Sequence, residues 1–207
     1  MHSKKTLSGG KKLKEADKVL IMLHGRGGTA EDILSLASEL KVDGFALLAP
    51  QATNHTWYPY SFLAPPADNE PWLGSALQLL KELVDDLLEQ GFSSEDLYFL
   101  GFSQGACLTL EFIAGNAKRY GGAAAFTGGL IGDRIYPEKY KGDLGGTPVF
   151  IGAGDQDPHV PLERVQESTA VLKRMHAVVT EVIYPGRPHT IIRDEIEQVN
   201  KLLFTLS

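Results

Sequence analysis

The sequence predicts an α/β fold in which a mostly parallel, doubly wound sheet carries helices on both faces. Short apolar runs alternate along the chain with longer amphipathic stretches, the order that is typical of βαβ units. Most of these runs are apolar at every position, as expected for strands that helices cover on both sides. At 207 residues and with no internal repeat or shift of composition, residues 1–207 are expected to form a single domain.

The individual elements follow from this alternation. The expected strands are residues 19–23, 45–49, 97–102, 123–126, 149–153 and 178–184. The expected helices are residues 30–40, 73–90, 104–117, 162–175 and 191–206. In the second of these helices, Leu77, Leu80 and Val84 recur at helical spacing while Lys81 and Asp85 take the opposite side, which indicates an amphipathic helix.

Lysines crowd residues 1–18, and no apolar stretch follows them. A secretory signal is therefore not expected, and the segment is interpreted as a basic N-terminal arm or an edge hairpin. A phosphate-binding patch is the weaker interpretation, because no aromatic residues are interspersed among these charges.

Composition narrows the possible partners and the location. A net charge of −6 argues against a nucleic-acid partner, and no apolar run reaches the roughly 18 residues of a transmembrane segment. The single cysteine, Cys107, excludes an internal disulfide and a cysteine-rich metal site, which weakly favours a cytoplasmic protein. The oligomeric state is not predicted.

One connection, residues 50–72, is unusually long and contains several prolines. It also holds both tryptophans, whereas a disordered linker would be poor in aromatic residues. The loop is interpreted as the wall of a substrate pocket near the active site, and the alternative that it only covers the core stays open. The substrate-binding candidates are Trp57, Tyr58, Phe62 and Trp72.

The strongest motif is GFSQGA, residues 101–106, which lies between a predicted strand and a predicted helix. This is the G-x-S-x-G pattern of the α/β-hydrolase fold, in which a sharp turn presents a nucleophilic serine. Side chains at Gly101 and Gly105 would crowd such a turn. Ser103 is therefore the candidate nucleophile.

In α/β-hydrolases the acid follows the serine along the chain, on a loop after a later strand. The segment GDQDPHVP, residues 154–161, offers Asp155 and Asp157. Asp157 is favoured because Pro158 restricts its backbone, and Asp155 is expected to cap the turn.

The base should come last, in the loop before the final helix. His189 lies there, between the last predicted strand and helix. His159 is too close in sequence to Asp157, and His176 falls at the end of a predicted helix, where it would act as a C-terminal cation.

Oxyanion donors are expected from the loop LHGRGG, residues 23–28, and from the residue after the nucleophile. They are the backbone N–H groups of Arg26 and Gln104. His24 is interpreted as a structural histidine that braces this loop, which leads to a helix with a capping box formed by Thr29 and Asp32.

Three other interpretations remain in view. The same loop fits a dinucleotide-binding fingerprint, but the second strand ends in Ala49-Pro50-Gln51 without the required acidic residue. A metal site built on residues 155–159 lacks the glycine and the distant glutamate of a calcium loop, so no metal is expected. A non-catalytic protein of hydrolase fold that binds a small ligand or partner is the third.

With LHGRGG, GFSQGA, GDQDPHVP and YPGRPHT in this order, the chain resembles the phospholipase/carboxylesterase family of α/β-hydrolases, which includes acyl-protein thioesterases. The resemblance covers nearly all of the chain from Val19. It implies cofactor-free hydrolysis of a small-molecule ester or thioester, lysophospholipids among them. By motif it implies the same triad and oxyanion donors. The chain departs from the family at Arg26, at Arg187 and in its aromatic loop, which leaves the acyl group open.

Overall fold

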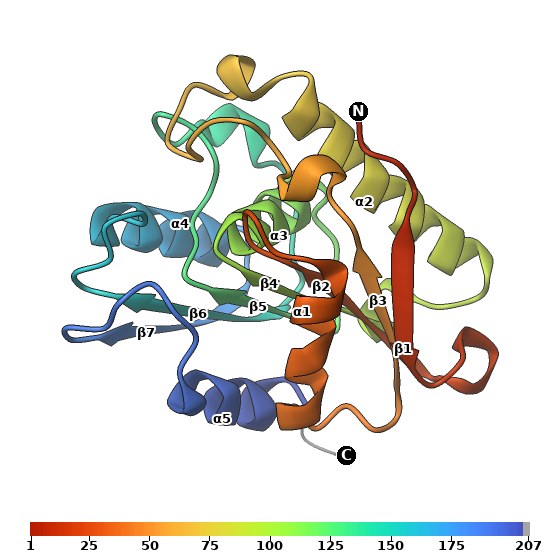
Figure 1. Ribbon diagram of the computed structural model, residues 1–207. Helices are drawn as coiled ribbons and strands as arrows, with labels where there is room; N and C mark the ends of the chain where they lie inside the picture. Colours follow the sequence, from red (N-terminus) through yellow and green to blue (C-terminus); the bar gives the residue numbers. More distant parts are fainter. Residues whose placement is uncertain (205–207) are drawn as a thin grey trace.

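One twisted sheet organises this computed structural model, which describes residues 1–204 (Figure 1). Its strands lie in the order β1-β3-β2-β4-β5-β6-β7, and every neighbouring pair except β1 with β3 is parallel. In chain order they are β1 (Thr6–Gly10), β2 (Lys18–Leu23), β3 (Phe45–Pro50), β4 (Leu97–Phe102), β5 (Gly122–Phe126), β6 (Pro148–Gly154) and β7 (Val178–Tyr184).

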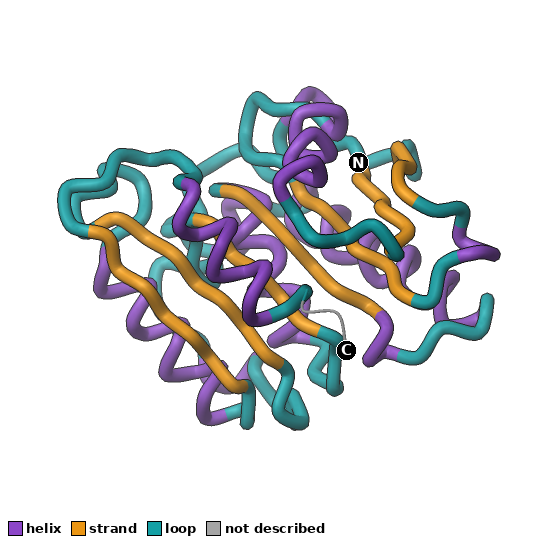
Figure 2. Tube along the Cα trace, turned by 90° about the horizontal axis from the view of Figure 1, so that it is seen from below, coloured by secondary structure: helices purple, strands orange, loops and turns teal. Residues whose placement is uncertain are grey.

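Helices cover both faces of the sheet, as the view from below shows (Figure 2). One face carries α2 (Trp72–Glu89), α3 (Gln104–Gly115) and α4 (Leu162–Arg174). The other carries α1 (Ala30–Ser35) and α5 (Arg193–Leu202). The prediction of a mostly parallel sheet between two layers of helices is confirmed.

Strand β2 shows why its sequence is apolar at every position. Leu20 and Met22 belong to the core beneath α1 and α5, whereas Val19, Ile21 and Leu23 belong to the core beneath α2, α3 and α4. All five side chains are completely buried. Alternate residues of a strand point to opposite faces, so a strand covered on both sides needs apolar side chains throughout.

Two predicted helices are shorter than expected by five residues or more. The stretch 30–40 is α-helical only over α1 and continues as a 3₁₀ turn, Leu36–Glu39, a common ending for an α-helix. The stretch 191–206 is helical over α5 alone, and its last two residues lie outside the described part of the chain.

The N-terminal segment contributes an edge strand. Strand β1 runs antiparallel to β3, with Thr6 opposite Pro50 and Gly10 opposite Ala46. The hairpin interpretation of residues 1–18 is therefore wrong, because the partner of β1 is not its neighbour in sequence. Within residues 1–204, no helix is both long enough and apolar enough to cross a bilayer. The cytoplasmic location stays a prediction.

Candidate active site

Ser103 lies at the sharp turn between β4 and α3, with φ 52° and ψ −116°. This conformation is unusual for a residue with a side chain and costs on the order of 1–3 kcal/mol. Two backbone hydrogen bonds hold it: the Ser103 N–H donates to the Phe126 carbonyl at 3.0 Å, and the Ser103 carbonyl accepts from Cys107 N–H at 3.0 Å. The strained turn presents the hydroxyl at the carboxyl end of the central strands.

The glycines on either side of Ser103 have the role that the sequence predicts. A Cβ at Gly101 would lie 2.2 Å from the Gly105 carbonyl oxygen, and one at Gly105 would lie 2.2 Å from the Leu23 carbonyl oxygen. Any side chain at either position would therefore push the first turn of α3 away from β4 or β2.

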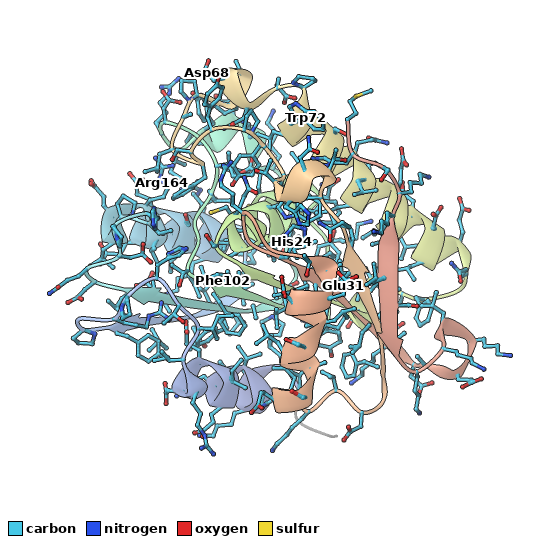
Figure 3. The ribbon with its side chains drawn as sticks, in the orientation of Figure 1. His24, Glu31, Asp68, Trp72, Phe102 and Arg164 are labelled. Atoms are coloured by element: carbon cyan, nitrogen blue, oxygen red, sulfur yellow. The ribbon has the colours of Figure 1, made fainter. Side chains whose placement is uncertain are left out.

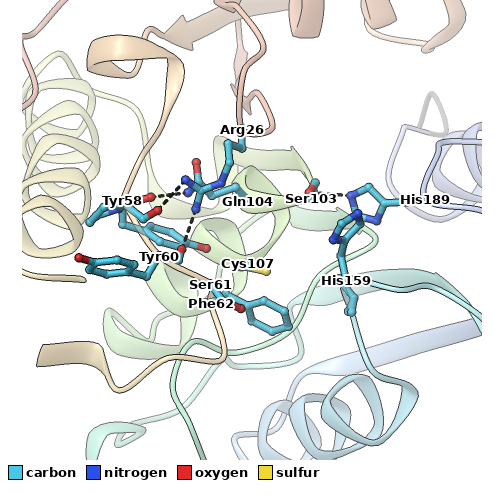
Figure 4. A pocket seen from close by; sticks show the side chains of 12 residues that line it. Arg26, Tyr58, Tyr60, Ser61, Phe62, Ser103, Gln104, Cys107, His159 and His189 are labelled. Carbon is cyan, nitrogen blue, oxygen red and sulfur yellow. Dashed lines mark hydrogen bonds between the residues drawn. The ribbon is translucent and has the colours of Figure 1, made fainter. Parts of the chain in front are cut away.

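The structure brings the three candidate triad residues together, although they are far apart in sequence. His189 Nε2 lies 2.8 Å from Ser103 Oγ (Figure 4). On the other side of the ring, His189 Nδ1 lies 2.7 Å from Asp157 Oδ2. A carboxylate can only accept a hydrogen bond, so the imidazole proton is on Nδ1 and the lone pair of Nε2 faces the serine hydroxyl. In this tautomer the imidazole can accept the proton of Ser103.

The environment of Asp157 favours the carboxylate. Burial opposes the charge, but hydrogen bonds from His189 and from two backbone N–H groups outweigh it, so the pKa of Asp157 is lowered. Those N–H groups belong to His159 and Val160 and donate to Oδ1 at 2.8 and 3.0 Å. Asp157 is thus held as an anion that can orient an imidazolium.

The other acidic and histidine candidates lie elsewhere. Asp155 accepts a hydrogen bond from Gly186 N–H at 2.7 Å and so caps the turn that leads to His189. His176 is exposed and bonds to Asp143. His24 is buried and accepts the Ala52 N–H at 3.1 Å, in agreement with its predicted bracing role.

The predicted oxyanion donors flank the nucleophile. Neither the Arg26 nor the Gln104 backbone N–H has a hydrogen-bond acceptor within residues 1–204. Gln104 is the first residue of α3, where N–H groups lack intrahelical partners and the helix dipole favours negative charge. Both groups remain available to a ligand oxygen.

A cavity of about 430 Å³ opens beside Ser103. Its walls are Arg26, the segment 58–62, Gln104, Cys107, His159, Val160 and His189. Burial raises the pKa of the Cys107 thiol to about 12, so this group stays neutral and does not compete as a nucleophile. Of the substrate-binding candidates, Tyr58 and Phe62 line this cavity.

The structure contradicts the assignment of the two tryptophans to the pocket. Trp57 is completely buried, donates from its indole N–H to the His24 carbonyl at 2.9 Å and packs on the His24 ring. Trp72 begins α2 (Figure 3) and packs edge-on against His2, with ring centroids 5.2 Å apart. Neither indole lines the cavity. For Trp57 the reason is that a large indole is best buried where its N–H finds an acceptor, here the His24 carbonyl.

The sequence prediction missed His159 as a lining residue. Its ring lies edge-on to His189, with centroids 4.9 Å apart, and faces the cavity (Figure 4). Its position two residues after Asp157 excludes it as the base, but the same proximity places it beside the base.

A buried ion pair beneath the histidine loop was also missed. Arg187 pairs with Glu195, and both side chains are at most 4 % exposed. The same guanidinium donates to the Thr190 carbonyl at 2.9 Å and to Thr127 Oγ1 at 3.0 Å. Arg187 thereby ties the loop that carries His189 to α5 and to the end of β5.

The ion pair predicts a pH dependence of stability. Burial raises the pKa of Glu195 from about 4.5 to about 7, against the opposing pull of Ile192 N–H and Arg187. The Glu195 carboxyl therefore binds a proton more tightly in the folded chain than in the unfolded chain. This difference stabilises the fold at low pH, and the stabilisation is lost as the pH rises from about 4.5 to about 7. Between pH 5 and 8 the unfolding free energy should fall more for the wild type than for Glu195→Gln, measured with urea. Equal changes in both proteins would contradict this.

The dinucleotide interpretation does not fit the structure. The N–H of Ala30, at the start of α1, is taken by the side-chain oxygen of Gln51 at 2.9 Å, where a pyrophosphate would have to bind. Thr29 and Asp32 form the predicted capping box at the same helix end. Within residues 1–204 there is also no group of three or more candidate metal ligands.

The family model described as phospholipase/carboxylesterase matches residues 10–207. A crystal structure of a phospholipase/carboxylesterase from Dyadobacter fermentans is 55% identical, with a TM-score of 0.97, over 99% of this chain and 98% of that one. Acyl-protein thioesterase 1 of Kluyveromyces lactis is 29% identical over 93% of both chains. A probable carboxylesterase SOBER1-like of Arabidopsis thaliana is 27% identical over 65% of this chain, which spans about half of that protein (52%).

Proposed function

This chain belongs to the phospholipase/carboxylesterase family of α/β-hydrolases and is a carboxylic ester hydrolase, and we propose that it works through an acyl-enzyme formed on Ser103. The observation that supports the proposal is the continuous hydrogen-bonded path from Ser103 through His189 to Asp157.

In the first step, Ser103 Oγ attacks the ester carbonyl carbon while His189 Nε2 takes the hydroxyl proton. The carbonyl oxygen becomes an oxyanion, which accepts hydrogen bonds from the backbone N–H groups of Arg26 and Gln104. Asp157 stabilises the imidazolium without taking its proton. The tetrahedral intermediate then collapses, and His189 gives the proton to the leaving alcohol or thiol.

In the second step, water attacks the acyl-enzyme carbonyl. His189 again accepts the proton, now from water, and returns it to Ser103 Oγ as the acyl–oxygen bond breaks. The products are a carboxylic acid and the free enzyme. All the acid–base chemistry is thus carried by one imidazole, whose orientation Asp157 fixes.

The leaving group and the acyl group occupy opposite sides of Ser103. The leaving atom receives its proton from His189 and must therefore lie beside that ring. The acyl chain then points away from His189, toward the cavity wall at Tyr58 and Phe62. Oxygen esters, thioesters and lysophospholipids all fit this arrangement, since they share an acyl carbonyl.

An acyl-enzyme predicts a product ratio that does not depend on the leaving group. We expect the hexanoyl esters of p-nitrophenol, a thiol and glycerol, hydrolysed in the presence of methanol, to give the same ratio of methyl hexanoate to hexanoic acid. A ratio that varies with the leaving group would show direct attack by water and contradict the proposal. Because the ratio is set after the leaving group departs, it holds whichever step limits the rate.

A further inference from the structure

The side chain of Arg26 has no role in the proposed chemistry, yet it makes three hydrogen bonds to the aromatic loop. Its guanidinium donates to Thr56 Oγ1 and the Pro59 carbonyl at 2.9 Å each. It also donates to the Tyr60 carbonyl at 2.6 Å (Figure 4). No carboxylate within residues 1–204 pairs with it. The guanidinium therefore bonds to one wall of the cavity. Residues 56–62, which form this wall, are called the wall segment below.

The side chain of Gln104 also bonds to this segment. Its oxygen accepts the Trp57 N–H at 2.8 Å, and its NH₂ donates to the Tyr58 carbonyl at 2.8 Å. Arg26 and Gln104 are the two residues whose backbone N–H groups face the expected oxyanion. The wall segment is therefore hydrogen-bonded to the side chains of both residues whose backbones are the expected oxyanion donors.

The far end of the wall segment has separate anchors. The buried side chain of Asn69 accepts the Tyr60 N–H at 2.8 Å and donates to the Ser61 carbonyl at 3.0 Å. The Phe62 carbonyl accepts from Gly132 N–H at 2.8 Å. Loss of the Arg26 contacts should therefore loosen the wall locally without releasing the whole loop.

We propose that Arg26 is a specificity-determining positioning residue. Its side chain fixes the wall segment against the oxyanion loop, and contact with this wall determines which acyl-chain lengths the enzyme prefers. The inference rests on the proposed function, because it takes the acyl chain to point from Ser103 toward Tyr58 and Phe62. A long acyl chain would contact the wall, whereas an acetyl group would stop short of it.

The test compares p-nitrophenyl acetate with p-nitrophenyl hexanoate. Arg26→Met keeps most of the side-chain volume and removes all the donors. This substitution should lower kcat/KM for the hexanoate about tenfold more than for the acetate. The reason is that it removes the charge-assisted hydrogen bonds that hold the wall segment where the longer acyl chain contacts it. Arg26→Lys should give an intermediate ratio, because its ammonium group donates from a single nitrogen whereas the planar guanidinium donates from several.

Arg193→Met is the matched control. Arg193 is on α5, and its side chain is 91% exposed. Among the described residues 1–204 it pairs with Glu197 alone, one turn away, so this variant should keep the wild-type ratio. A hexanoate-to-acetate ratio in Arg26→Met equal to that of the wild type would overturn the proposal. A general loss of folding would lower both specificity constants together and leave the ratio unchanged.

Amide hydrogen exchange tests the positioning role without turnover. In Arg26→Met, the backbone amides of residues 56–58 and of Tyr60 should exchange faster than in the wild type, while α3 keeps its protection. Unchanged exchange there would refute the positioning role. If the wild type hydrolysed neither ester, the proposed function would fail, and the exchange experiment would still decide whether Arg26 fixes the wall.

Discussion

Ser103→Ala is expected to lower kcat by roughly 10³–10⁶ with the fold intact, judged from other serine triads. The alanine removes the hydroxyl that lies 2.8 Å from His189 Nε2 and leaves the base, the carboxylate and the backbone donors in place. The rate that remains would come from direct attack by water in a site that still binds the oxyanion. Initial rates with p-nitrophenyl esters, at matched enzyme concentration, measure the loss.

Ser38→Ala is the matched control for this loss. Ser38 is exposed, and in the described part of the chain its hydroxyl bonds to the Ser35 carbonyl alone. The variant should keep the wild-type rate. If Ser103→Ala also kept most of its activity, the nucleophile would have been assigned to the wrong residue.

Arg187→Met is expected to be the most destabilising of these substitutions, by about 3–5 kcal/mol at pH 8, where the wild-type Glu195 carboxylate is charged. The substitution leaves that carboxylate buried without its counter-charge. It also removes the hydrogen bonds to Thr190 and Thr127 that fix the histidine loop. Urea unfolding at pH 8 measures the first effect, and a fall in kcat of about 10² is expected from a displaced His189.

A double substitution separates the charge from the loop contacts. In Arg187→Met combined with Glu195→Met, no buried charge remains, so most of the lost stability should return. The loss of kcat should persist, because the contacts to Thr190 and Thr127 are still absent. A double variant as unstable as Arg187→Met alone would show that the buried charge is not the cause.

The sequence predicts the chemistry of the site better than its surroundings. The sharp turn at Ser103 is predicted by Gly101 and Gly105, where a side chain would crowd the backbone. The order of the triad residues along the chain limits the candidate acid and the candidate base to one loop each. Pro158 favours Asp157 over Asp155, and in the structure Asp157 contacts His189 whereas the side chain of Asp155 caps a turn. These inferences are local, and each depends on a few neighbouring residues.

The aromatic loop shows where local inference stops. Its composition predicts an ordered loop but does not say which side chains face the cavity and which face the core. Trp57 and Trp72 pack inward because His24 and His2 offer flat partners and the His24 carbonyl offers an acceptor. Tyr58 and Phe62 line the cavity. Only the three-dimensional arrangement reveals this division.

Long-range pairing explains the remaining differences. Strand β1 is polar and glycine-rich, and only its antiparallel partner β3 makes it a strand. Arg187 and Glu195 look like surface residues in the sequence, since each belongs to a polar stretch. Their burial depends on the approach of α5 to the end of β5, which no local pattern encodes.

Labelling with a fluorophosphonate tests the central claim most directly, because the reagent forms a bond only with an activated serine. The account predicts one adduct per chain in the wild type, located on Ser103 by mass spectrometry, and a greatly slowed reaction in His189→Gln. An adduct on another residue, or a rate that His189→Gln leaves unchanged, would contradict the account. No adduct at all would favour a ligand-binding protein without catalysis.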